Sequence, residues 1–177
     1  MAAALVAVAL LVGCGGGGVD PDTARLREAD AALREAPDDQ YAMAEVIRVA
    51  AAGAGRRVDP GAGGYEPEAR PFLRRAAEVW PRYVRASRRH PNVSVSSLMV
   101  GVFGNGLNRP RDAARSAELV AQERPTASSF LSLADWSSRA GDRRQAVLAA
   151  QKALELAEPE DRARVRAAIR QFREQQG

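Results

Sequence analysis

The sequence predicts an all-α protein, and three observations support this. Alanine, the strongest helix former, occurs throughout the 177 residues and lets packed helices approach closely. Isoleucine, a strong strand former, occurs only at Ile47 and Ile169. No stretch alternates cleanly between apolar and polar residues, as a half-buried strand would. The length suits one domain with a sizeable core, so we expect a single domain of about seven or eight helices.

The N-terminus begins with an uncharged apolar run, residues 2–13. In a helix this run would span about 18 Å, against the roughly 30 Å hydrocarbon core of a membrane. It is too short for a membrane span, but it fits the apolar region of a secretory signal peptide. No Lys or Arg precedes it, where a signal peptide carries positive charge. Residues 1–13 are therefore interpreted as a signal peptide, or as the remainder of a membrane anchor whose true start lies upstream.

Leu11-Val12-Gly13-Cys14 resembles a bacterial lipobox, the motif that is cleaved before a cysteine destined to carry lipid. Four glycines follow, and residues 14–21 would form a flexible tether. The resemblance implies lipidation of Cys14 and a protein held in the bacterial cell envelope, facing outside the cytoplasm. A truncated single-span anchor implies the same side of the membrane. An N-terminus of no structural consequence is the third alternative.

Proline and glycine divide the first half of the remaining chain. Helices are expected over residues 21–36, after a cap at Asp38, and over residues 66–89. The last of these would be one long helix or a kinked pair, because Pro81 lies within it. Residues 53–64 are expected to form a loop.

Helix boundaries are clearer in the second half. Pro91-Asn92 would end one helix and cap the next, and Thr126 would cap another. Gly141-Asp142 predicts a turn. Pro159 and the two acids after it would open a last helix over residues 160–175, whose apolar stripe consists of Val165, Ala168, Ile169 and Phe172.

Residues 127–159 resemble a tetratricopeptide repeat, a helix–turn–helix unit of about 34 residues. Phe130, Leu133 and Ala134 occupy the large, leucine and small positions of its first helix, and Gly141-Asp142 occupies its turn. The small residues of its second helix are Ala146, Ala150 and Ala153. Ser137 stands where an aromatic residue is usual.

A shift of 33 residues gives a weaker copy over residues 93–125, and degenerate copies further upstream end at Pro91 and Pro37. The resemblance implies a helix–turn–helix repeat solenoid over residues 22–177, closed by the helix at 160–175 as a polar-faced cap.

Membership of the tetratricopeptide-repeat family would imply a non-enzymatic adaptor that binds a partner protein or peptide. The family's groove is lined by the first helix of each repeat. Carried over by position, the implied groove residues are Ser128, Leu131, Asp135 and Ser138, with Val95, Leu98, Val102 and Asn105 from the preceding copy. They lack the lysine and arginine clamp that some relatives use for a C-terminal carboxylate.

The positive charge is concentrated in one stretch. The formal net charge is +4, but residues 70–90 hold seven arginines and one acid, Glu78. Two pairs, Arg70 with Arg74 and Arg85 with Arg89, have the spacing of one helix face. Such a stripe would suit anionic lipid headgroups, an acidic partner or nucleic acid, or it would simply be a solvated face. Without interleaved aromatic residues, and on an exported protein, nucleic acid is not expected.

Catalytic and metal chemistry find little support. One cysteine and one histidine, His90, argue against a disulfide and against most zinc sites. No serine lies in a GxSxG setting, and no lysine follows the glycine cluster at residues 101–106. We expect no enzyme activity, cofactor or metal. Trp80 is expected in the core, whereas Trp136 would lie either in the core or at the edge of the groove.

Overall fold

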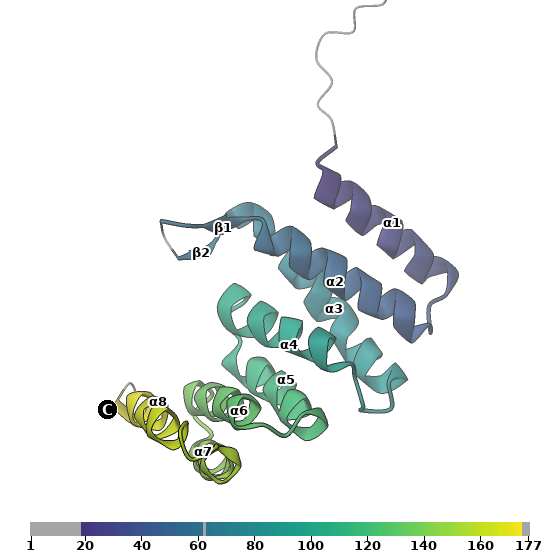
Figure 1. Ribbon diagram of the computed structural model, residues 1–177. Helices are drawn as coiled ribbons and strands as arrows, with labels where there is room; N and C mark the ends of the chain where they lie inside the picture. Colours follow the sequence, from purple (N-terminus) through teal and green to yellow (C-terminus); the bar gives the residue numbers. More distant parts are fainter. Residues whose placement is uncertain (1–18, 62, 175–177) are drawn as a thin grey trace, which may run out of the picture.

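The computed structural model describes residues 19–61 and 63–174 of the chain (Figure 1). This part contains eight α-helices, which confirms the all-α prediction. They are α1 (Pro21–Glu35), α2 (Gln40–Gly55), α3 (Arg70–Ala86), α4 (Val93–Gly101), α5 (Pro110–Glu123), α6 (Ala127–Arg139), α7 (Arg143–Leu156) and α8 (Arg162–Glu174).

Three short elements interrupt the helices. Inside the predicted loop, strands β1 (Val58–Asp59) and β2 (Gly64–Tyr65) form a two-residue antiparallel pair. A 3-10 turn (Pro67–Ala69) leads into α3, which remains one helix across Pro81. A π-helical turn (Val102–Gly106) continues α4.

Side-chain oxygens cap the helix starts. Asn92 and Thr126 act as the N-caps of α4 and α6, as predicted, and Thr126 forms a reciprocal capping box with Ser129. The predicted cap at Asp38 is wrong by one residue, because the carboxylate of Asp39 accepts the first-turn N–H at 2.8 Å. The last helix starts at Arg162, two residues later than predicted.

α3 ends at Ala86, three residues before its predicted end. Arg88 and Arg89 adopt left-handed backbone angles, with φ of 52° and 66°. The N–H of Arg89 donates to the carbonyl of Val84 at 3.0 Å, as in a Schellman motif. Because left-handed residues cannot continue a right-handed helix, Arg85 and Arg89 do not share a helix face, and that part of the predicted arginine stripe is wrong.

Helices that follow one another in the chain pack together, most extensively α2 with α3 and α6 with α7 (Figure 1). Small side chains make many of these contacts. Completely buried alanines occur in five helices and in the 3-10 turn: Ala50, Ala69, Ala76, Ala113, Ala117 and Ala153 are 0 or 1% exposed. Alanine permits short distances between helix axes, so each pair is held by many backbone-near contacts.

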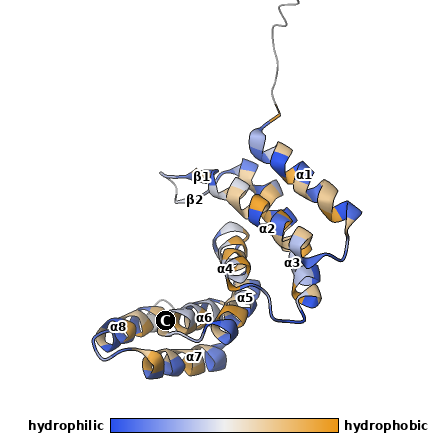
Figure 2. Cartoon of the chain, turned by 45° about the vertical axis from the view of Figure 1, so that its right-hand side comes forward, coloured by the Kyte–Doolittle hydropathy of each residue, from blue (hydrophilic) through white to orange (hydrophobic). Residues whose placement is uncertain are grey.

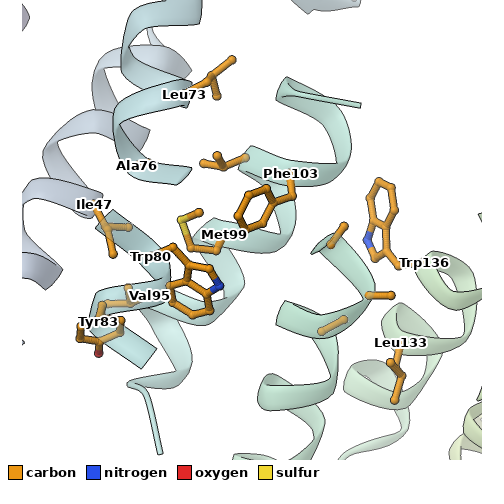
Figure 3. Packing of buried hydrophobic residues seen from close by; sticks show 14 of the residues in the cluster. Ile47, Leu73, Ala76, Trp80, Tyr83, Val95, Met99, Phe103, Leu133 and Trp136 are labelled. Carbon is orange, nitrogen blue, oxygen red and sulfur yellow. The ribbon is translucent and has the colours of Figure 1, made fainter. Parts of the chain in front are cut away.

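Larger residues fill the space between successive pairs. Figure 3 shows Ile47, Met99 and Phe103 leading from α2 through α4 and its π-helical turn toward Trp136 of α6. The buried residues form one continuous core. Trp80 and Trp136 are only 7% and 9% exposed, so Trp136 belongs to the core and does not form a groove edge.

The π-helical turn inserts one residue into its helix. From the cap Asn92 to the left-handed Asn108 the chain is one residue longer than from the cap Thr126 to the left-handed Gly141. A π-turn absorbs such an insertion within an otherwise regular helix. The two segments therefore match at a shift of 34 residues before the turn and of 33 after it.

Gly104 lies in the π-helical turn directly beneath the indole ring of Trp136. A methyl group at position 104 would overlap the six-membered part of the ring. The guanidinium carbon of Arg139 lies 4.8 Å from the ring centre. The glycine thus permits close contact between this turn and α6.

Two arginines after α2 hold the start of α1. The Asp22 carboxylate accepts hydrogen bonds at 2.9 Å from Arg56 Nε and from Arg57 Nη1, and Arg57 also pairs with Asp20 at 2.6 Å. The Asp22 side chain is 11% exposed. The hydrogen bond from Arg56 is the main reason why the pKa of Asp22 falls to about 2, although desolvation opposes the shift. This cluster links the N-terminal helix to the rest of the fold.

The Asp22 cluster predicts an acid-dependent stability. Because the folded-state pKa lies below the ordinary value of 3.8, the ionised carboxylate stabilises the fold above about pH 4, and this contribution disappears as the pH falls toward 2. Asp22→Asn should lower the melting temperature by a few degrees at pH 7, and the difference from wild type should shrink across that window. Circular dichroism melts at several pH values would measure this. Glu28→Gln, an exposed change on α1, is the control, and a pH-independent difference would contradict the prediction.

Gly104→Ala should destabilise the protein by about 1–3 kcal/mol, because the new methyl group must displace a packed indole ring. Chemical denaturation at neutral pH measures the loss. Gly101→Ala is the matched control, since nothing lies within 4 Å of its added methyl group and the change favours helix. Equal stabilities for the two variants would show that the close contact has no energetic importance.

Candidate partner-binding site

The candidate site lies on the exposed faces of α2, α4 and α6. α2 contacts α4, and α6 contacts α8, so the even-numbered helices form a row beside α3, α5 and α7. Exposed residues recur along α2 with the spacing of one helix face: Tyr41, Glu45, Arg48 and Ala52. α4 presents a matching face that is almost uncharged.

The predicted groove residues of α6 occupy different surroundings. Ser128 is exposed, whereas Leu131 and Asp135 are partly buried. The Asp135 carboxylate accepts a hydrogen bond from Arg139 Nε at 3.0 Å. Ser138 lines a smaller crevice between α6, α7 and α8, of about 160 Å³. The four residues lie on one side of the helix but do not share one pocket.

On α4 the prediction is half wrong. Leu98 is 40% exposed and Asn105 is exposed, but Val95 and Val102 are 0% and 3% exposed and belong to the core. The error has a physical cause: the alignment used a shift of 33 residues throughout, whereas α4 before its π-helical turn matches α6 at 34. One residue of slip rotates a helix by about 100° and exchanges buried for exposed positions.

At the corrected shift, the α4 residues that match the predicted α6 positions change. Ser94, Ser97 and Gly101 replace the buried valines as the counterparts of Ser128, Leu131 and Asp135. Ser94 and Ser97 are exposed, and Gly101 is partly buried. Sequence reasoning missed these residues because the inserted residue has no local signature apart from the nearby glycines.

An open crevice of about 520 Å³ runs between the first turns of α4 and α6 and is closed below by the end of α5. We call it the α4–α6 crevice. Its apolar wall consists of Val93, Val100 and Val120, and its hydroxyl-bearing residues are Ser97, Thr126, Ser128, Ser129 and Ser132. Thr126 and Ser129 are engaged in the capping box. The hydroxyls of Ser97, Ser128 and Ser132 make no hydrogen bond within the described part of the chain.

Arg124 is the one charged residue that lines this crevice. It is exposed, and no described carboxylate pairs with it. The neighbouring Glu123 is instead 2.6 Å from the Nδ1 atom of His90. Sequence reasoning missed Arg124, although its place between the end of one helix and the Pro125-Thr126 start of the next was a usable signal.

The arginine stretch divides into engaged and free side chains. Arg75 pairs with Asp30 at 2.8 Å and with Glu78 at 3.1 Å, and Arg82 donates to the carbonyl of Pro37. The exposed arginines that pair with no described carboxylate are Arg70, Arg74, Arg85, Arg88 and Arg89. Figure 2 shows the hydrophilic connection from α3 to α4 that carries the last two.

The proposed membrane attachment falls on residues outside the described part. Cys14, residues 1–13 and most of the tether at 14–21 belong to it. Among residues 19–61 and 63–174, none of the helices has both the length and the apolar character needed to cross a membrane. In the same residues, no group of three or more His, Cys, Asp or Glu side chains is arranged to hold a metal ion.

No family model, curated protein or solved structure matches this chain.

Proposed function

We propose that this protein is a membrane-tethered adaptor that faces outside the cytoplasm and binds a segment of a partner protein along α4 and α6. The function is binding and not catalysis. The proposal joins the repeat-like sequence of residues 127–159 to the row of exposed helix faces.

The α4–α6 crevice is the observation that carries the proposal. Its volume of about 520 Å³ lies in the range of ligand sites, and it combines an apolar wall with hydroxyls that have no internal partner. A serine hydroxyl both donates and accepts, so Ser97, Ser128 and Ser132 suit the alternating N–H and C=O groups of a peptide backbone. Burial of Val93, Val100 and Val120 beneath a bound chain would supply apolar contact area.

The tether rests on the resemblance of residues 11–14 to a lipobox. A lipid on Cys14, followed by glycines, would hold the helical domain near the membrane while leaving its exposed faces accessible. Attachment also raises the local concentration of the domain around partners in the same membrane.

A second candidate function is direct binding to an anionic envelope surface. Arg70, Arg74 and Arg85 favour it, because they are exposed along one side of α3 and pair with no described carboxylate. Such binding would weaken as salt concentration rises, since exposed charges are screened.

Site-specific photo-crosslinking tests the adaptor. A photoreactive amino acid at Ser97 or Leu98 should give a discrete crosslinked product in cells that express the full chain, because a partner segment would cover these positions. The same amino acid at Gln151, exposed on α7, is the control and should give none. Equal products from both faces, or no product from α4, would contradict the proposal.

Membrane fractionation separates the two means of attachment. Cys14→Ser should move most of the protein from the membrane to the soluble fraction, because the lipid would be lost. The triple variant Arg70→Glu, Arg74→Glu, Arg85→Glu should remain in the membrane fraction. The opposite pattern, with salt-sensitive release of the triple variant and retention of Cys14→Ser, would favour the charged surface. Reversal of Arg25, Arg27 and Arg34 on α1 produces the same change in net charge and serves as the control.

A further inference from the structure

The α4–α6 crevice has a distinct charge arrangement. Arg124 is its single charged lining residue, and no acid lines it. At the other end of α5, by contrast, Arg109 and Arg115 lie 2.6 Å and 3.6 Å from the carboxylate of Asp112. Arg124 is therefore an unneutralised cation beside a partly apolar hollow.

The backbone at Arg124 is held from both sides. Its N–H donates to the carbonyl of Val120 at 2.9 Å, and its own carbonyl accepts a hydrogen bond from Ser129 Oγ at 2.7 Å. Pro125 follows and restricts the chain further. Little backbone freedom remains to be lost when the guanidinium binds a ligand, which favours a defined contact over a diffuse one.

We propose that the α4–α6 crevice binds an extended peptide segment with an internal acidic side chain, whose carboxylate pairs with Arg124. This inference rests on the proposed function and adds the chemistry of the partner. A guanidinium matches a carboxylate through two parallel hydrogen bonds, so a Glu or Asp side chain is the complement of this cation. The three free serine hydroxyls would serve the peptide backbone on either side of the acid, and the valines would contact its apolar neighbours.

The lining favours an internal acid over two other anionic groups. The crevice is open, and its hydroxyls are distributed over two helices, which suits a chain that continues in both directions. A phosphate group carries about −1.5 to −2 charges and is usually met by a cluster of arginines, whereas one arginine lines the crevice.

Peptide selection followed by variant binding tests this inference. A displayed library of short random peptides is selected on the full chain, and the dissociation constants of the selected peptides are measured by fluorescence anisotropy. We expect an acidic residue at a constant position. Replacing it by Gln or Asn should weaken binding about tenfold, which is the effect of a charge-assisted hydrogen bond at an exposed site.

Protein variants locate the contact. Arg124→Gln should weaken binding of the acidic peptide about as much and remove the preference for Glu over Gln, whereas Arg124→Lys should keep part of it because the charge remains. Arg144→Gln, an exposed change on α7 with the same loss of charge, should bind like wild type. Circular dichroism confirms that the variants are folded.

Three results would overturn the inference while leaving the adaptor intact. They are peptides that bind at Ser97 and Ser128 without an acidic preference, a preference that survives Arg124→Gln, and binding that requires a free C-terminal carboxylate or a phosphoserine in place of the acid. Failure of the photo-crosslinking experiment together with a selection that yields no crevice-binding peptide would overturn the adaptor as well.

Discussion

The fold depends on the close approach of neighbouring helices, and small residues at the contact faces allow it. Ala50, Ala76 and Ala153 lose all their exposure between helices. Larger side chains then fill the space between successive pairs, where Met99, Phe103 and Trp136 form a continuous core (Figure 3). Because a protein interior is packed almost without voids, a change in the distance between two helices must be accommodated by the next pair.

The same close packing determines which residues face a partner. The π-helical turn adds one residue and lets Gly104 accommodate the ring of Trp136. The insertion also sets the rotation of α4 relative to a repeat of constant length. Val95 consequently faces the core, while Ser94 and Ser97 face solvent. A packing adjustment inside the protein thereby decides the chemistry of the exposed surface.

Internal pairing decides which arginines are available for binding. Arg56, Arg57 and Arg75 join helices by bonding to carboxylates of α1 and of the residue that caps it. These side chains contribute to the fold and are removed from the basic surface. Arg124 pairs with no described carboxylate and lines the α4–α6 crevice, so its charge is available to a ligand. Clustering of arginines in the sequence is therefore a poor guide to clustering of free charge.

Local signals were enough to predict the helical class and most helix boundaries. N-caps, prolines and left-handed glycines act within one turn of a helix, which is why Asn92, Thr126 and Gly141 were assigned correctly from residue type alone. The two α4 valines, the position of Trp136 and the importance of Arg124 depended on tertiary structure. Helix rotation, burial and proximity across helices result from packing between residues distant in the chain, and one inserted residue reverses them without altering any local preference.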